Sequence, residues 1–279
     1  MTHHTHDDHD EHDLGFAHDL PRLMGRRAIL LGLGGAALAA ASPAAALDCV
    51  ALPWETAGPY PADGSNLRDG QTVNALTQSG ILREDLRTSF GNLSGTADGA
   101  RLDLAISLQD AAGCTPLAGH AIYLWACDAQ GRYSLYDLPQ QNYQRGLGVA
   151  DSDGALRFTT VFPACYPGRW PHFHFEIFAS PEAAVSGEAS LLTAQMALPR
   201  DVCEALYAAD ARYDGSTKTL ARLTLASDMV FADNSDAQIA QQTPAVEATG
   251  DGYAGTITIP VDLTAQRPAG RGMAPRPRG

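Results

Sequence analysis

Residues 101–108 read Arg-Leu-Asp-Leu-Ala-Ile-Ser-Leu, with a branched apolar side chain at every second position. This period of two is typical of a β-strand with one buried face, because successive side chains of a strand point to opposite faces. Four further short runs rich in β-forming residues are expected to be strands, at residues 121–126, 156–162, 172–178 and 255–261. Short helices are expected at residues 199–210 and 233–242. The sequence therefore predicts an all-β fold, an antiparallel β-sandwich with few short helices.

The first 46 residues have the composition of an export signal. A leader rich in His and Asp precedes the pair Arg26-Arg27, and an uncharged stretch rich in Ala, Gly and Leu ends in Ala44-Ala45-Ala46. Twin arginines before a mildly apolar segment resemble a Tat signal, and the run of small residues resembles a signal-peptidase site. The stretch is too weakly hydrophobic for a stable membrane span. We therefore expect residues 1–46 to direct export by the Tat route to a periplasmic or extracellular location.

The rest of the chain is expected to form one domain and a tail. Residues 47–263 carry all the predicted strands and open with an irregular arm at residues 51–95, whereas residues 264–279 are rich in Pro, Arg and Gly and are expected to be a disordered tail. The formal net charge of −13 at pH 7 argues against a nucleic-acid partner, which would require a basic surface. The five cysteines match no zinc module. In an exported protein they are expected to form disulfides, with at least one cysteine left unpaired.

A pair of histidines marks the candidate site. In the run Tyr166-Pro-Gly-Arg-Trp-Pro-His-Phe-His-Phe175, His172 and His174 are two residues apart on an expected strand. Their side chains therefore point to one face, and the phenylalanines point to the other. Two imidazoles on one face form half of a site for iron, copper, nickel or zinc. A bare His-x-His pair more often marks two structural histidines that bind no metal, and the residues alone leave both alternatives open.

Two kinds of additional ligand lie near these histidines in the sequence. Tyr133 and Tyr166 would supply phenolate oxygens, which are hard anionic donors and would favour ferric over ferrous iron. Glu176 is on the same face of the expected strand and would instead complete a copper or ferrous site on a cupin-like barrel. The residues alone do not choose between these two donor sets.

Seven pieces of the sequence, taken in order, carry a family resemblance. The first reads Glu55-Thr-Ala-Gly-Pro-Tyr60, and the fifth is the run from Tyr166 to His174. The others lie at residues 116–119 with 122–134, 151–154, 158–161, 193–195 and 252–257. Together they resemble the intradiol ring-cleavage dioxygenases, the family of protocatechuate 3,4-dioxygenase and catechol 1,2-dioxygenase, and especially its exported single-domain branch.

The resemblance implies a site and an activity. It implies one Fe(III) ion held by Tyr133, Tyr166, His172 and His174, with Tyr166 as the ligand that a catechol displaces. It places the active-site arginine at Arg169 and a glutamine near the pocket at Gln195. Gly58-Pro59-Tyr60 corresponds to a segment that lines the substrate cavity together with Arg169. The implied reaction is intradiol cleavage of a catechol-type diol by dioxygen to a muconate-type diacid.

Three departures from the family pattern keep a second hypothesis open. Members of this branch often have His at position 126, Gln at position 148 and Gly-Trp at positions 164–165, where this chain has Ala126, Gly148 and Ala164-Cys165. The last two departures are expected to border the pocket. The alternative is therefore a catalytically silent, exported β-sandwich module that binds phenolics or cell-wall material.

Overall fold

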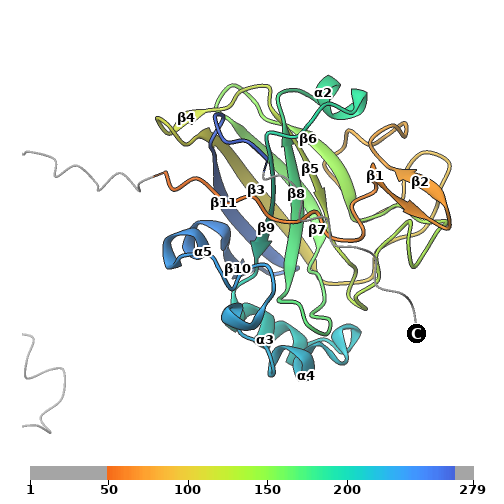
Figure 1. Ribbon diagram of the computed structural model, residues 1–279. Helices are drawn as coiled ribbons and strands as arrows, with labels where there is room; N and C mark the ends of the chain where they lie inside the picture. The colour runs from red at the N-terminus through yellow and green to blue at the C-terminus, as the bar shows by residue number, and fades with distance from the viewer. Residues whose placement is uncertain (1–48, 268–279) are drawn as a thin grey trace, which may run out of the picture. The chain divides into compact units, whose positions relative to one another are not determined.

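The computed structural model describes residues 49–267 (Figure 1). The leader and signal peptide predicted in residues 1–46 lie outside the described residues, as do residues 268–279 of the predicted tail. Within residues 49–267, no helix is long and apolar enough to cross a membrane.

The first sheet is organised around the strand that the sequence identifies most clearly. Its order is β10-β11-β3-β4, and β7 pairs with β3 as well. The strands are β3 (Arg101–Asp110), β4 (Thr115–Pro116), β7 (Ala155–Val161), β10 (Ala245–Ala248) and β11 (Tyr253–Val261). Leu102, Leu104 and Ile106 are buried, as the period of two predicts. One pairing differs from the expected antiparallel arrangement, because β11 runs parallel to β3 over its whole length.

The second sheet is antiparallel and carries the histidines. Its order is β6-β5-β8-β9. The strands are β5 (Ala121–Trp125), β6 (Arg145–Val149), β8 (His172–Phe178) and β9 (Leu192–Ala197). Apolar residues of both sheets belong to one core, which confirms the predicted all-β sandwich. A Cβ added to Gly148 of β6 would lie 2.7 Å from the side chains of Leu156 and Phe158 on β7. Gly148 was expected to border the pocket, but it lies between the two sheets instead.

The pairing of these four strands divides their side chains between two faces. One face packs toward β7, since Gly148 is paired with Ile122 and lies against that strand. We call the opposite face the outer face. A row of four paired residues crosses it from strand to strand: Arg145 on β6, Trp125 on β5, His174 on β8 and Gln195 on β9. The predicted ligand His174 thus sits in the middle of this row.

The N-terminal arm covers the outer face. Its early part, coloured orange, runs across β9 and β8 toward the hairpin of β1 (Asp63–Arg68) and β2 (Gln71–Asn74), as Figure 1 shows. The amide of Glu55 donates to the carbonyl of Thr193 on β9, at 2.8 Å. We call residues 55–61 the strap. The arm was expected to be irregular, and the hairpin within it was not predicted.

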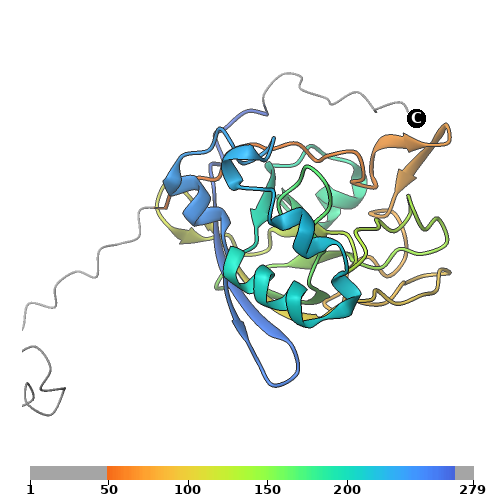
Figure 2. The same cartoon turned by 90° about the horizontal axis from the view of Figure 1, so that it is seen from below.

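Helices occupy the connections of the domain. They are α2 (Pro181–Ser186), α3 (Arg200–Ala209), α4 (Ser216–Leu220) and α5 (Asp236–Gln242), and α3 and α5 match the two predicted helices. Figure 2 views the domain from the end at which α3 and α4 lie. A disulfide joins Cys49 to Cys114, which ties the start of the arm to the turn between β3 and β4. The other three cysteines, Cys127, Cys165 and Cys203, are free and buried.

Candidate metal centre

Strand β8 places two neutral imidazoles side by side. All seven of its residues are buried, and the Nε2 atoms of His172 and His174 are 2.9 Å apart. Nδ1 of His172 lies within hydrogen-bond distance of the Trp170 carbonyl, which can only accept, so this nitrogen carries the proton. Burial lowers the pKa of both imidazoles well below the usual value, so both are neutral. The Nε2 lone pair of His172 therefore faces His174.

Two phenols complete a compact group with the histidines. The hydroxyl oxygen of Tyr133, in the loop between β5 and β6, lies 3.2 Å from that of Tyr166 and 3.2 Å from Nε2 of His174. The Tyr166 hydroxyl lies 3.2 Å from Nε2 of His172. Burial raises the pKa of both phenols. We call Tyr133, Tyr166, His172 and His174 the donor cluster.

The donor cluster fits a metal ion. Five distances between its four donor atoms fall between 2.9 and 3.5 Å. In a regular tetrahedron with edges of this length, the centre lies about 2 Å from each corner, which is the usual length of a metal–imidazole bond. A cation at that point would stabilise the imidazole lone pairs and would lower the pKa of the phenols, whose ionisation burial otherwise opposes.

A carboxylate does not join the cluster. Among residues 49–267, no three His, Cys, Asp or Glu side chains are grouped so as to hold a metal ion, so His172, His174 and Glu176 form no such site. Glu176 instead accepts a hydrogen bond from Thr193 on β9, at 3.0 Å. A metal ion at this point would therefore have two imidazoles and two phenols as its donors, a set that suits ferric iron.

Arg169 and Gln195 meet at the edge of the cluster. Nη2 of Arg169 donates to Oε1 of Gln195 at 2.6 Å, and Nε2 of Gln195 donates to the carbonyl of Thr56 in the strap at 2.8 Å. Arg169 also forms an ion pair with Asp228, a fully buried carboxylate. Asp228 was not predicted, since it lies far from Arg169 in the sequence and belongs to no recognisable motif.

The strap passes over the donor cluster at Gly58. A Cβ added to Gly58 would lie 3.1 Å from Cε1 of His174. The ring of Tyr60 lies 5.0 Å from that of Tyr133, whereas Pro59 is exposed. The segment that was expected to line the substrate cavity therefore borders two of the four candidate ligands.

Exposure distinguishes the two tyrosines. Tyr133 is only 2% exposed, whereas Tyr166 is only partly buried and is followed by the exposed Pro167 and Gly168.

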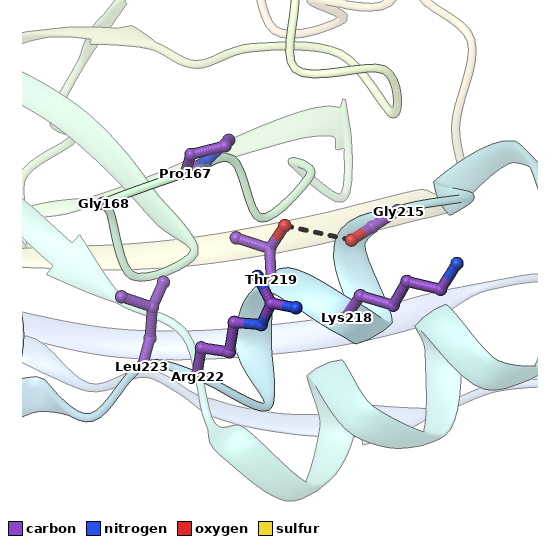
Figure 3. A pocket seen from close by; sticks show the side chains of 7 residues that line it. All are labelled: Pro167, Gly168, Gly215, Lys218, Thr219, Arg222 and Leu223. Carbon is purple, nitrogen blue, oxygen red and sulfur yellow. Dashed lines mark hydrogen bonds between the residues drawn. The ribbon is translucent and has the colours of Figure 1, made fainter.

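A cavity of about 390 Å³ borders the turn at Pro167 and Gly168. Residues of α4 and of the segment after it line the opposite side of this cavity (Figure 3). Its lining includes Lys218 and Arg222 but none of the four residues of the donor cluster.

The remaining departures lie near the cluster without adding a donor to it. Ala126 follows Trp125 and is buried. Ala164 and Cys165 precede Tyr166 and are also buried, and the amide of Cys165 donates to Oγ of Ser216 at 3.1 Å. Burial raises the pKa of the Cys165 thiol to about 12, so the thiol is neutral.

Comparison with known proteins agrees with this architecture. Residues 80–203 match a family model described as Dioxygenase. A stretch of 70 residues is 34% identical to catechol 1,2-dioxygenase from Pseudomonas sp. (strain EST1001), and it covers 25% of this chain and 23% of that protein. The match thus spans about a quarter of the relative's length.

Solved structures share the fold over most of the chain. An intradiol ring-cleavage dioxygenase from Tetranychus urticae gives a TM-score of 0.59 at 19% identity, covering 79% of this chain and 98% of that one. A second dioxygenase crystal structure gives the same TM-score and identity, covering 78% and 97%. The chain thus contains a match to the dioxygenase family model over residues 80–203, and its fold is that of an intradiol ring-cleavage dioxygenase.

Proposed function

We propose that this protein is an Fe(III)-dependent dioxygenase that cleaves a catechol-type diol between its two hydroxyl-bearing carbons. Both atoms of dioxygen enter the product, a muconate-type diacid, so the reaction needs no further oxidant or reductant. The observation that carries the proposal is the convergence of Tyr133, Tyr166, His172 and His174, whose donor atoms lie 2.9 to 3.5 Å apart. Bound ferric iron would act there as a Lewis acid and a template for the diol.

The two tyrosines are suited to different tasks. Tyr133 is buried and in contact with His174, so it would stay in place throughout the reaction. Tyr166 is the more exposed, so it is the side chain that would move aside when a diol approaches. The departing phenolate oxygen of Tyr166 would accept one proton from the diol, which favours substrate binding as its dianion.

Arg169 would contribute a fixed positive charge. An arginine stays protonated at any physiological pH, and its side chain is only 11% exposed. Its hydrogen bonds to Gln195 and Asp228 hold the guanidinium at one edge of the cluster. From there it would stabilise negative charge that develops on substrate oxygens.

An oxygen-electrode screen of the iron-loaded protein tests this proposal. The panel should hold neutral and carboxylated catechols, since Lys218 and Arg222 line the cavity beside the Tyr166 turn. We expect oxygen uptake with a diacid product, and a broad visible band from tyrosinate-to-iron charge transfer. Tyr166→Phe should alter the band and His172→Ala should largely abolish it. A colourless protein with stoichiometric iron would contradict the proposal, and a catechol-induced spectral change without oxygen uptake would favour the silent binding module.

We also propose that the protein is exported by the Tat route. The proposal is supported by Arg26-Arg27 and Ala44-Ala45-Ala46, and by the Cys49–Cys114 disulfide, a bond typical of oxidising compartments. N-terminal sequencing of protein from the periplasm or medium should find a start after Ala46. Retention of the full-length chain in the cytoplasm would contradict it.

A further inference from the structure

Arg145 is a completely buried arginine in the same row as a candidate iron ligand. It lies on β6 and pairs with Trp125, which pairs on its other side with His174. The rings of Trp125 and His174 are stacked, with centroids 5.1 Å apart. The guanidinium therefore lies on the outer face of the sheet, the face that carries the donor cluster.

The charge of Arg145 has no carboxylate partner. None of the ion pairs formed among residues 49–267 includes it. A buried charge without a counter-ion is strongly unfavourable unless its hydrogen bonds are complete. Here they are complete, because the five N–H groups of the guanidinium make five hydrogen bonds to neutral oxygens.

These five bonds join two segments that border the donor cluster. On the strap, Nη2 donates to the carbonyl of Tyr60 at 3.0 Å and Nη1 to that of Pro61 at 2.8 Å. On the loop after Tyr133, Nε donates to Oγ of Ser134 at 3.1 Å and Nη2 to its carbonyl at 2.9 Å. The fifth bond runs from Nη1 to the hydroxyl of Tyr123, which itself donates to the carbonyl of Pro61.

The strap is thus anchored at both ends across the cluster. At the β9 end, Gln195 holds the Thr56 carbonyl, and at the β6 end Arg145 holds Tyr60 and Pro61. Between the anchors, Gly58 lies against His174. The same guanidinium fixes the residue that follows Tyr133, so one side chain sets the distance between the strap and a candidate ligand.

We propose that Arg145 is a positioning residue of the dioxygenase site, which locks the Tyr60–Pro61 end of the strap to the Tyr133 loop. The proposal rests on the proposed function. The role is geometric, since it depends on a planar fork that reaches five oxygens at once. A lysine would keep the charge but could not reproduce the fork, so it would not replace Arg145.

The test compares iron-loaded, full-chain variants with the wild type. Arg145→Lys and Arg145→Met remove the fork, and Tyr123→Phe removes only one of its five acceptors while the ring is kept. Arg157→Met is the matched control, because Arg157 is an exposed arginine on β7. The readouts are the position and intensity of the visible band per iron, kcat and KM for catechol, and Tm.

We expect both Arg145 variants to shift the band and to lower kcat/KM by about tenfold or more, the usual loss when a group that orients a metal ligand is removed. Tyr123→Phe should shift both in the same direction by less, and Arg157→Met should match the wild type. Folded Arg145 variants with a wild-type band and kcat/KM, and only a lower Tm, would overturn the proposal. Full rescue by Arg145→Lys would also overturn it, because charge alone would then suffice.

Two further outcomes are decisive. If neither Arg145 variant folds, Tyr123→Phe and Ser134→Ala become the deciding variants, and a wild-type band and kcat/KM in both would overturn the inference. If the iron-loaded wild type itself lacks the band and takes up no oxygen, the proposed function fails, and this inference fails with it. The two failures are distinguishable, since the first is seen only in the variants.

Discussion

Nε of Arg169 lies 3.1 Å from Oδ2 of Asp228, and this carboxylate is completely buried. The same oxygen accepts a hydrogen bond from the amide of Trp170, and Oδ1 accepts one from the amide of Val230. Asp228, which directly follows the 3-10 turn Leu225–Ser227, therefore connects that turn to the residues that lead into β8. Through this contact, a carboxylate distant in the sequence holds the arginine whose positive charge acts on His172 and His174.

Asp228→Asn should destabilise the protein and slow the reaction. The substitution leaves the buried guanidinium of Arg169 without its counter-charge, and loss of one partner of a buried ion pair typically costs about 3–5 kcal/mol. Urea unfolding measures that loss, and kcat should fall because Arg169 is no longer fixed beside Gln195. Glu204→Gln is the control, since it removes the same charge from an exposed pair with Arg200 and should cost less than about 1 kcal/mol. Equal effects of both variants would refute this account of Asp228.

Replacing the two tyrosines by phenylalanine should have different consequences. Tyr133→Phe removes a buried donor that contacts both histidines. Loss of a residue that only supports a metal ligand typically lowers metal affinity about 10–100-fold, so loss of this donor should lower iron affinity by at least as much. Tyr166→Phe should retain iron better, because this side chain is the more exposed, but it should lower kcat by removing the proton acceptor. Iron retention during dialysis against a chelator and steady-state kinetics separate the two effects. Indistinguishable variants would mean that the tyrosines are equivalent.

Glu55 makes the stability of the domain depend on pH. Burial raises its pKa to about 7, although the hydrogen bonds that it accepts from Asn234 and Gln242 lower the pKa. The folded protein therefore keeps this proton up to about pH 7, whereas the unfolded chain loses it near 4.5, the ordinary pKa of a glutamate side chain. The contribution to folding is thus fully present below pH 4.5 and is lost as the pH rises through 7.

The Glu55→Gln variant isolates this effect. Glutamine cannot ionise and keeps the acceptor oxygen, so its stability relative to wild type should rise between pH 4.5 and 7 by up to about 3 kcal/mol. The free energy of unfolding in urea, measured at several pH values, gives the difference directly. Glu84→Gln controls for removal of an exposed carboxylate. A Glu55→Gln difference that stays constant with pH would rule out this titration.

The strands were predictable wherever a local pattern recorded burial. The period of two over residues 101–108 gave β3, and the run from His172 gave β8 with its observed bounds. The parallel pairing of β11 with β3 was not predictable, because the sequence of a strand does not state its neighbour. Strand β6, Arg-Gly-Leu-Gly-Val, was not predicted, because glycine is uncommon in strands and two of its five residues are glycines. The structure needs these glycines, because Leu86 and Phe158 pack closely against them.

The residues of the candidate site were predictable from the sequence, but the buried residues that hold them in place were not. A motif that spans ten residues brought His172, His174, Tyr166 and Arg169 to attention. Arg145 and Asp228 escaped notice, because an arginine and an aspartate are ordinary surface residues in a sequence, and only the fold shows that both are fully buried. Supports of this kind depend on contacts between distant segments, which a local pattern cannot contain.

Gly58→Ala tests whether the strap must approach His174 closely. Gly58 has a φ of 74°, a left-handed conformation that costs other residues about 1–2 kcal/mol, and its added Cβ would lie 3.1 Å from Cε1 of His174. The strap or the imidazole would have to move by a few tenths of an ångström. We therefore expect a lower Tm, a shifted visible band and a higher KM for catechol. Gly187→Ala is the matched control, since Gly187 has a φ of 81° but no neighbour within 4 Å, so it carries the backbone strain without the contact. If both variants lose stability and neither changes the band, the contact between strap and imidazole has no part in shaping the site.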